Sequence, residues 1–403
     1  MNNLRSAAPL VATLVTALAG SPAAAQSSPQ TQPVGRPLTF GSLQVYPSIS
    51  LRDIGVDTNI YNETVVVRQD FTYTVAPRVL AELPIGNSHL VGTGGLGFMF
   101  FRQYKDQQSL SGLASGLFEV RTGRVRPSLS GGFNRSRQRG GDVDMRAFSV
   151  STNGRAGVEV GVSGITSFTA WVVRDKTAFA PGQRFREVSL SDQLDRSTTT
   201  FAAGARLDFT PLTSVVAAVE FEQTRFSVSR TRDSDSLKIA PTVRFAEGAI
   251  INGQASVGVR DFRSVTGLLP PFRGLIASGD LRYTLMNVTR FEVRANRDIS
   301  YSYDNLYPYY LEAGGQLTVS QRIVGPFDGI VLGGRRTLHY QPIDVLAERH
   351  VEAIRSWGGG LGVRVDDNMR FTATVDRETR VSSRSDLREY ERTRVFAALE
   401  YLP

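Results

Sequence analysis

The chain has 403 residues, no cysteine and three histidines, and its 46 Lys and Arg residues exceed its 38 Asp and Glu residues. The lack of cysteine excludes a disulfide scaffold, a thiolate zinc site and an iron–sulfur cluster, and three scattered histidines argue against a histidine-rich metal centre. The net charge of +8 would suit nucleic acid, but the chain has no basic patch interleaved with stacking aromatics. We therefore predict no metal, no cofactor and no nucleic-acid partner.

Residues 1–25 have the pattern of a secretory signal peptide. Arg5 precedes an apolar stretch from Ala7 to Ala19, and Ala23–Ala25 supplies small residues at a cleavage site. Residues 26–42 are polar and rich in proline, which is typical of a flexible periplasmic lead. The mature chain is therefore expected to leave the cytoplasm.

Residues 43–403 show a dominant hydrophobic period of two, which is the period of a β-strand. In residues 200–209, 237–245, 290–299 and 369–376, apolar side chains fall on one face and charged or polar side chains on the other. Turns rich in Gly, Asn, Asp and Pro separate such segments. The whole region is therefore predicted to be β-sheet.

The connections between the strands alternate in length. Short turns such as Gly86–Asn87 and Met286–Asn287 alternate with long polar loops such as 57–69 and 178–196. Eight short turns and nine long loops predict about 18 strands, with 16 as the alternative, and place both termini on the short-turn side. Short periplasmic turns, long external loops and an even strand number characterise bacterial outer-membrane barrels. The predicted fold is all-β, a transmembrane antiparallel up-and-down β-barrel in the outer membrane.

A soluble propeller or sandwich is the alternative fold. Both have short alternating strands. The strands expected here run about 10 to 15 residues, whereas strands of globular sheets average five or six. The alternation of loop lengths also has no cause in a propeller, so a closed membrane barrel is favoured.

One face of each strand must then meet lipid and the other must line the lumen. The polar face carries more cations than acids, and nearly all the cations are arginine, which suits contact with carboxylates. For any single arginine, an ion pair within the wall is the simpler expectation. The residues predicted to line the lumen are Arg206, Lys238, Arg244, Arg260, Arg282, Arg290, Arg294, Arg322, Arg335, Arg364, Arg370, Arg392, Arg394, Glu220, Glu222 and Glu292.

Some motifs resemble chemical sites but lack the required context. Gly92–Gly97 fits the GxGxxG pattern, yet a strand follows it where a dinucleotide site needs a helix. Ser320 and His339 are the best candidates for a wall-borne serine–histidine pair, without a third residue to orient the base. Asp142 and Asp144 stand in a predicted outer loop and are expected to be solvated. We predict no catalytic residues and no enzyme.

The start of the predicted barrel carries the most specific stretch. Tyr46–Leu51 is an apolar strand with a proline, and Gly55–Tyr61 reads Gly-x-Asp-x-Asn-apolar-aromatic. This pattern resembles the family of bacterial outer-membrane proteins called putative β-barrel porin 2. Members of that family are linked to exopolysaccharide loci, so the resemblance implies a role in polysaccharide export. One departure is the end of the chain, Tyr401-Leu402-Pro403, where such barrels commonly end in an aromatic residue.

The function expected from the sequence is a channel that exports an anionic or neutral exopolysaccharide across the outer membrane. A general or solute-specific uptake porin is the first alternative, and a structural surface barrel without transport is the second. The expected partners are outer-membrane lipid, lipopolysaccharide and the barrel-assembly machinery, together with polysaccharide and periplasmic export proteins if the channel exports.

Overall fold

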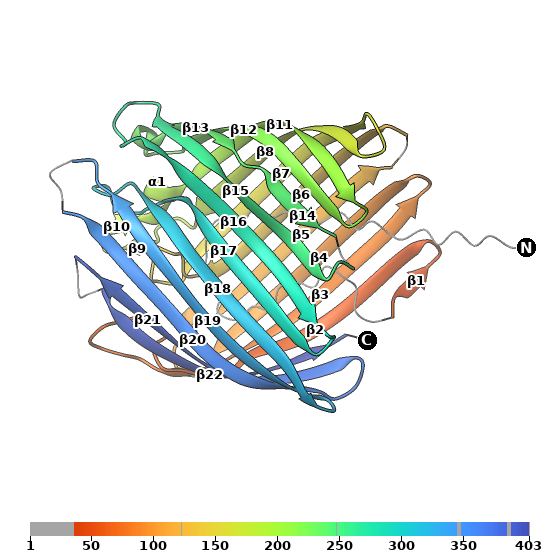
Figure 1. The fold of residues 1–403 in the computed structure, drawn as a ribbon. Coiled ribbons are helices and arrows are strands. Elements are labelled where there is room, and N and C mark those ends of the chain that lie inside the picture. The colour runs from red at the N-terminus through yellow and green to blue at the C-terminus, as the bar shows by residue number, and fades with distance from the viewer. Residues whose placement is uncertain (1–35, 122, 247, 345–347, 385–387, 403) are drawn as a thin grey trace, which may run out of the picture.

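The structure, a computed structural model, is a barrel of long tilted strands (Figure 1). The predicted signal peptide lies outside the described residues. No helix within the described part is long and apolar enough to cross a membrane. The described residues are 36–121, 123–246, 248–344, 348–384 and 388–402.

Consecutive wall strands pair antiparallel around the barrel. The first group of strands is β1 (Leu38–Phe40), β2 (Leu43–Asp57), β3 (Asp70–Ile85), β4 (Ser88–Phe101), β5 (Ser109–Val120), β6 (Val125–Gln138), β7 (Ala147–Gly161), β8 (Thr166–Phe179), β11 (Arg196–Thr210) and β12 (Thr213–Phe226). The second group is β13 (Ser234–Ile239), β14 (Thr242–Phe245), β15 (Ile251–Ser264), β16 (Phe272–Leu285), β17 (Thr289–Tyr301), β18 (Tyr309–Val324), β19 (Phe327–Gln341), β20 (His350–Arg364), β21 (Met369–Ser382) and β22 (Tyr390–Tyr401). The loops contain the short helices η1 (Lys105–Gln107), α1 (Leu190–Leu194) and η2 (Arg230–Arg232), and the small strands β9 (Arg184–Phe185) and β10 (Val188–Ser189).

The wall closes because β2 pairs with both β3 and β22. β13 and β14 are two halves of one wall strand, since both pair with β12 on one side and β15 on the other. The interruption falls at Ala240–Pro241, where proline has no N–H to donate to a ladder. β1 pairs with β2 alone and is not counted as a wall strand. The described chain then forms a closed barrel of 18 strands, as the sequence predicted.

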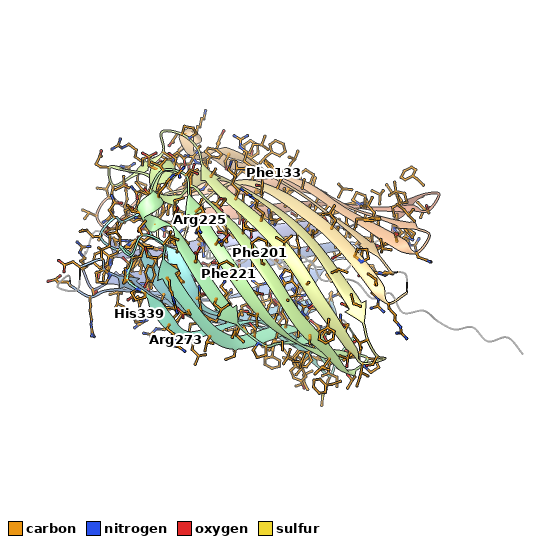
Figure 2. The ribbon with its side chains drawn as sticks, turned by 90° about the horizontal axis from the view of Figure 1, so that it is seen from above. Phe133, Phe201, Phe221, Arg225, Arg273 and His339 are labelled. Atoms are coloured by element: carbon orange, nitrogen blue, oxygen red, sulfur yellow. The ribbon has the colours of Figure 1, made fainter. Side chains whose placement is uncertain are left out.

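The alternation of side chains separates an apolar outer face from a polar inner face. Phe201 on β11 pairs with Phe221 on β12, and both side chains are exposed on the outside of the wall. Figure 2 shows these rings and Phe133 pointing outward from the ribbon. A face of this kind suits contact with lipid, because the closed sheet pairs the backbone groups of the strands internally.

The turns also follow from the sequence. Met286 and Asn287 both have positive φ, at 50° and 56°, as a two-residue type I′ hairpin turn requires. One boundary differs from the prediction. Residues 38–40 were expected to belong to a flexible lead, but they form β1, which pairs with the start of β2 around a turn at Gly41. The paired region therefore begins at Leu38.

The seam between β2 and β22 explains the distinctive N-terminal motif. A bulge between Leu51 and Ile54 shifts the register there, and a Cβ on Gly55 would stand 1.9 Å from the carbonyl oxygen of Val395. Only glycine lets the two backbones approach so closely. Two residues further along, the carboxylate of Asp57 accepts from Arg392 Nε at 2.9 Å. The motif therefore closes the barrel.

A new charge should affect membrane insertion differently on the two faces of the wall. Val375→Arg places a cation on the lipid face of β21, and we expect it to cost about 2–4 kcal/mol near the midplane and to reduce membrane insertion. Thr372→Arg, on the inner face of the same strand, should insert almost normally. The folded fraction is measured by heat-modifiable gel mobility after refolding into vesicles. Equal losses for both variants would show that the faces are wrongly assigned.

Candidate functional site

The structure places the predicted lumen residues, with one exception, on the inner face of the wall. The assignment follows from cross-strand partners, which share a face in an antiparallel sheet. The residues on this inner face are Arg206, Lys238, Arg244, Arg260, Arg282, Arg290, Arg294, Arg322, Arg364, Arg370, Arg392, Arg394, Glu220, Glu222 and Glu292.

Arg335 is the exception, and its predicted place in the lumen is wrong. Its side chain lies on the outer face of β19, in phase with Val331 and His339, which are both exposed there. The inward residue is the next one, Arg336, whose Nη1 lies 3.7 Å from Glu312 Oε1. Two consecutive arginines after two glycines give no clear phase, so the sequence alone assigned the wrong one.

Most of the inner cations are engaged by acids of the wall. Glu222 receives Lys238 Nζ at 2.7 Å and Arg260 Nη2 at 2.6 Å, and Arg260 Nη1 also reaches Asp298 at 2.9 Å. These groups lie on β12, β13, β15 and β17, so they tie several strands together. They stabilise the wall and leave little free charge for a solute.

The three arginines around the Met286–Asn287 turn are also paired. Arg282 and Arg290 lie 4.0 and 3.9 Å from Glu292, and Arg294 lies 3.5 Å from Asp280. Elsewhere the sequence reasoning did not include inward acids that neutralise predicted cations. These further pairs are Arg370 with Asp328, Arg392 with Asp57, and Lys238 with Asp298. The expected cationic excess is therefore largely offset within the wall.

Arg155 and Arg244 are among the half-buried inner arginines that form no ion pair with a described acid. Arg244 lies near Arg155 and Arg206, and its Nε is buried without a hydrogen bond to any described residue. The Arg155 guanidinium sits 4.9 Å from the ring centre of Trp171, an inward residue of β8. Neither guanidinium makes an ion pair with a described residue. Arg155 and Arg244 are therefore the available anion-binding groups on this part of the wall.

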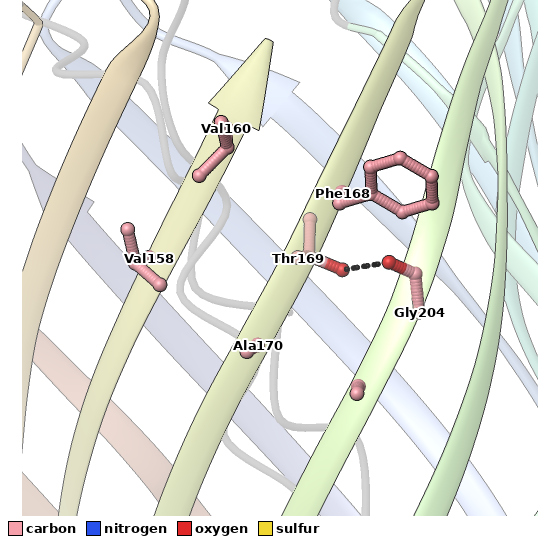
Figure 3. A pocket seen from close by; sticks show the side chains of 7 residues that line it. Val158, Val160, Phe168, Thr169, Ala170 and Gly204 are labelled. Atoms are coloured by element: carbon pink, nitrogen blue, oxygen red, sulfur yellow. Dashed lines mark hydrogen bonds between the residues drawn. The ribbon is translucent and has the colours of Figure 1, made fainter. Parts of the chain in front are cut away.

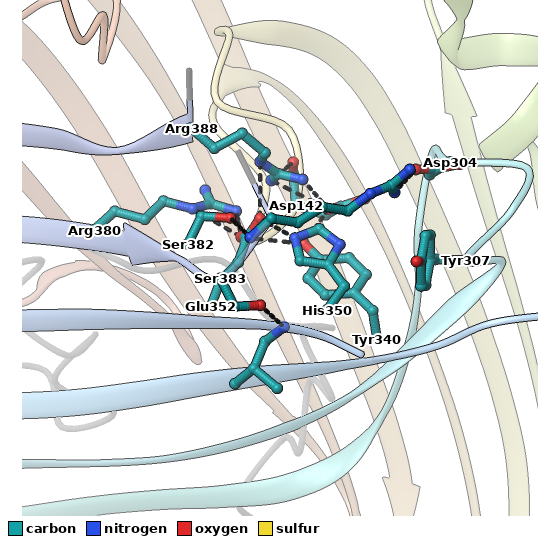
Figure 4. Close-up of polar contacts among 12 residues, drawn as sticks. Asp142, Asp304, Tyr307, Tyr340, His350, Glu352, Arg380, Ser382, Ser383 and Arg388 are labelled. Carbon is teal, nitrogen blue, oxygen red and sulfur yellow. Dashed lines mark hydrogen bonds and ion pairs between the residues drawn. The ribbon is translucent and has the colours of Figure 1, made fainter. Parts of the chain in front are cut away.

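The loop of residues 139–146, between β6 and β7, crosses to the opposite wall. Asp142 accepts hydrogen bonds from the Tyr340 hydroxyl, from the Tyr303 N–H at 2.9 Å and from Arg388 Nη1 at 3.3 Å (Figure 4). The wall strands β5, β4, β3, β2 and β22 lie between β6 and β21 on this side of the barrel. The loop therefore bridges the lumen, and we call residues 139–146 with their partners the loop latch.

Asp144 forms the second contact of the loop latch. It pairs with Arg380 of β21, and Arg388 Nε lies 3.7 Å from its other oxygen. Glu352 joins the two arginines, because Arg380 Nε donates to it at 2.9 Å and Arg388 Nε lies 3.0 Å away. His350 contacts the same carboxylate at 2.8 Å.

Burial limits how strongly these charges hold the loop. Burial raises the pKa of the Asp144 carboxyl, and the nearby Arg380 and Arg388 offset this only in part. A buried ion pair contributes little net stability, although removing one member is costly because the other charge is left unpaired. The charges therefore fix the position of the loop more than they drive its docking.

Apolar contacts join several outer loops to the latch. Val143 packs with Leu190 and Leu194 of α1 and with Tyr303. Arg232 from another loop donates to the carbonyl oxygen of Asp304 at 2.7 Å. A Cβ on Gly141 would stand 3.1 Å from the Tyr310 hydroxyl, so the loop backbone presses against the wall. Together these loops form a cap over the outer half of the lumen.

The two halves of the lumen differ in exposure. In the latch, the side chains of Glu352 and Arg380 are 0% and 1% exposed. Nearer the short turns, those of Arg290 and Asp280 are 48% and 53% exposed. Water therefore reaches the periplasmic half, and the constriction lies in the outer half.

One expectation about the loops is wrong, and one candidate pair is separated by the wall. Asp142 and Asp144 were expected to be solvated, but both are buried in the latch. Ser320 faces inward on β18 while His339 faces outward on β19, so they cannot act as a pair. The described residues also contain no cluster of three potential metal ligands.

A shallow surface hollow lies on the outer face. It is lined by Val158, Val160, Phe168 and Ala170, beside Gly204, whose carbonyl oxygen accepts from Thr169 at 3.4 Å (Figure 3). Small residues next to large ones leave this depression in the lipid-facing surface. Its apolar lining suits an acyl chain and offers nothing to a polar solute.

The family model described as Putative beta-barrel porin 2 matches residues 28–401. The chain belongs to this family. It is an outer-membrane, porin-like β-barrel channel. No curated protein matches the chain.

Two solved porins share the fold. A BenF-like porin from Pseudomonas fluorescens Pf-5 aligns with a TM-score of 0.51 at 11% identity, over 89% of this chain and 99% of that one. OccK2 (OpdF) from Pseudomonas aeruginosa, solved in complex with glucuronate, aligns with a TM-score of 0.50 at 9% identity, over 89% and 98%. At these identities the likeness shows the barrel architecture.

Breaking the contacts of the loop latch should widen the channel. Asp142→Ala removes the acceptor for Tyr340 and leaves Arg388 without one of its counter-charges, which should weaken loop docking by about 3–5 kcal/mol. Single-channel conductance in planar bilayers should rise and fluctuate more. The control Asp192→Asn changes a solvent-facing acid at the cap, and its conductance should match the native channel. An unchanged conductance for Asp142→Ala would contradict the bridging role of the loop.

Proposed function

We propose that this porin is a passive uptake channel for small anionic solutes that carry a carboxylate. The observation that supports the proposal is the pair of unengaged arginines, Arg155 and Arg244, on an inner wall whose other cations are mostly paired. A guanidinium without a carboxylate partner is free to bind one from a solute in bidentate geometry.

The surroundings of these arginines favour an anion in transit. Arg206 adds a third positive charge nearby, although Glu159 and Asp208 partly neutralise it. Glu220 lies close enough to Arg155 to interact electrostatically but makes no ion pair with it. A partly balanced site of this kind attracts an anion without holding it tightly, as conduction requires.

The loop latch supports uptake of small solutes over export of a polymer. The loop bridges the lumen and is fixed by buried contacts to Tyr340 and Arg388. A polysaccharide chain in transit would need these contacts to stay broken throughout its passage. The expectation of exopolysaccharide export finds no support in the comparisons, whereas the similar solved barrels are porins. Glucuronate, bound by OccK2, is a small carboxylate sugar of the proposed class.

The test uses the full mature chain in planar bilayers. Glucuronate should reduce the current at lower concentration than glucose, which has no carboxylate. Arg155→Gln with Arg244→Gln should weaken the glucuronate effect about tenfold, because two charge-assisted contacts are lost.

The matched control removes the same formal charge from engaged arginines. Arg282→Gln with Arg294→Gln should shift ion selectivity toward cations, since Asp280 loses its partner and Glu292 keeps only Arg290, yet should keep the glucuronate block. Equal block by glucose and glucuronate, or equal loss in both double variants, would refute a carboxylate site at Arg155 and Arg244.

A further inference from the structure

The outer wall carries two arginines directly opposite each other. Arg335 of β19 pairs in register with Arg355 of β20, and both side chains are exposed on the lipid-facing side. Opposite residues of an antiparallel pair have Cβ atoms about 4.5–5.5 Å apart, so the two guanidinium groups can reach a common ligand. His339, on the same face of β19, is also exposed.

No carboxylate of the described chain forms an ion pair with Arg335 or Arg355. Neither guanidinium has a hydrogen bond or ion pair with a described residue, and the outward carboxylate of Glu391 is engaged by Arg377 at 2.6 Å. Apart from Trp357, most of the surrounding outward residues are small. The small ones are Gly315, Gly333, Thr337, Ala353 and Thr379.

Other outward arginines show that the wall can supply partners. Arg225 pairs with Asp235 at 2.8 Å, and Arg263 pairs with Asp261 at 2.7 Å. Like charges directly opposite in a sheet destabilise it, and a cation facing lipid is unfavourable. An anion from outside the chain would therefore stabilise the two unpaired arginines, Arg335 and Arg355, on this face.

The depth of the couple identifies the source of that anion. Along β19 the outward positions are apolar from Phe327 to Gly333 and polar from Arg335 onward. Arg335 lies about 20 Å above Phe327 along the barrel axis, at about 3.4 Å of rise per residue on a strand tilted by about 40°. Trp357, just below Arg355, is 61% exposed, as an interfacial aromatic would be. The couple thus lies at the external edge of the apolar band.

We propose that Arg335 and Arg355 form a binding site for a phosphate group of lipopolysaccharide in the outer leaflet. At that edge the phosphates of lipid A meet the wall, and arginine binds phosphate in bidentate geometry. The small neighbours leave room for the headgroup, and the acyl chains lie along the apolar surface below. The site is separate from the lumen and does not depend on the proposed transport function.

The test is native mass spectrometry of the full mature chain in detergent, with diphosphoryl lipid A as the probe. The native protein should retain one lipid A, and monophosphoryl lipid A should bind more weakly. Arg335→Gln with Arg355→Gln should lower retention about tenfold, since two charge-assisted contacts disappear. Both changes remove charge from the lipid face, so heat-modifiable mobility should show a folded barrel.

The matched control is Arg225→Gln with Arg263→Gln, which removes the same charge from the outer face at carboxylate-paired positions. Its retention of lipid A should equal that of the native protein. Equal retention by both double variants, or by both lipids on the native protein, would overturn the proposal. Displacement of lipid A by millimolar inorganic phosphate would also overturn it, because the site would then take free phosphate instead of a lipid headgroup.

Discussion

Closing the sheet upon itself is the constraint on which every other feature of this molecule depends. A strand edge left open in lipid would leave N–H and C=O groups without partners, at a cost of several kcal/mol each. The seam between β2 and β22 is where that constraint is met. Gly55 allows the backbones to approach, and Asp57 binds Arg392 across the join. Closure then sets the two faces, and with them the separate environments of lipid and lumen.

Charged side chains have different partners in three parts of the barrel. On the inner wall, acids such as Glu222 and Glu292 engage most arginines, which stiffens the barrel. In the latch, buried acids and arginines position a loop across the lumen. Arg155 and Arg244 inside, and Arg335 and Arg355 outside, form no ion pair with a described residue. Such unpaired guanidinium groups can bind an anion from outside the chain.

Much of the fold could be predicted from the sequence, because a barrel strand is a local pattern. The period of two gave the strands and most inward residues, and the turn at Met286–Asn287 follows from local chemistry. The predicted lumen position of Arg335 was wrong because the glycines before it do not show which positions of the strand face lipid and which face the lumen. The latch could not be predicted, since Asp142 finds Tyr340 and Arg388 at separations of 198 and 246 residues. Closure of the barrel brings the loop and these residues together, and no spacing in the sequence indicates that contact.

The position of the latch partners also has a consequence for assembly. Asp142 and Asp144 bind residues on β19, on β21 and in the loop before β22, which are among the last parts of the chain to be made. These residues face the loop across the lumen only when β2 has paired with β22. The barrel must therefore close before its cap can form. A newly inserted molecule therefore passes through a stage in which the lumen is open from end to end. Docking of the loops, which narrows the channel, is the final folding step.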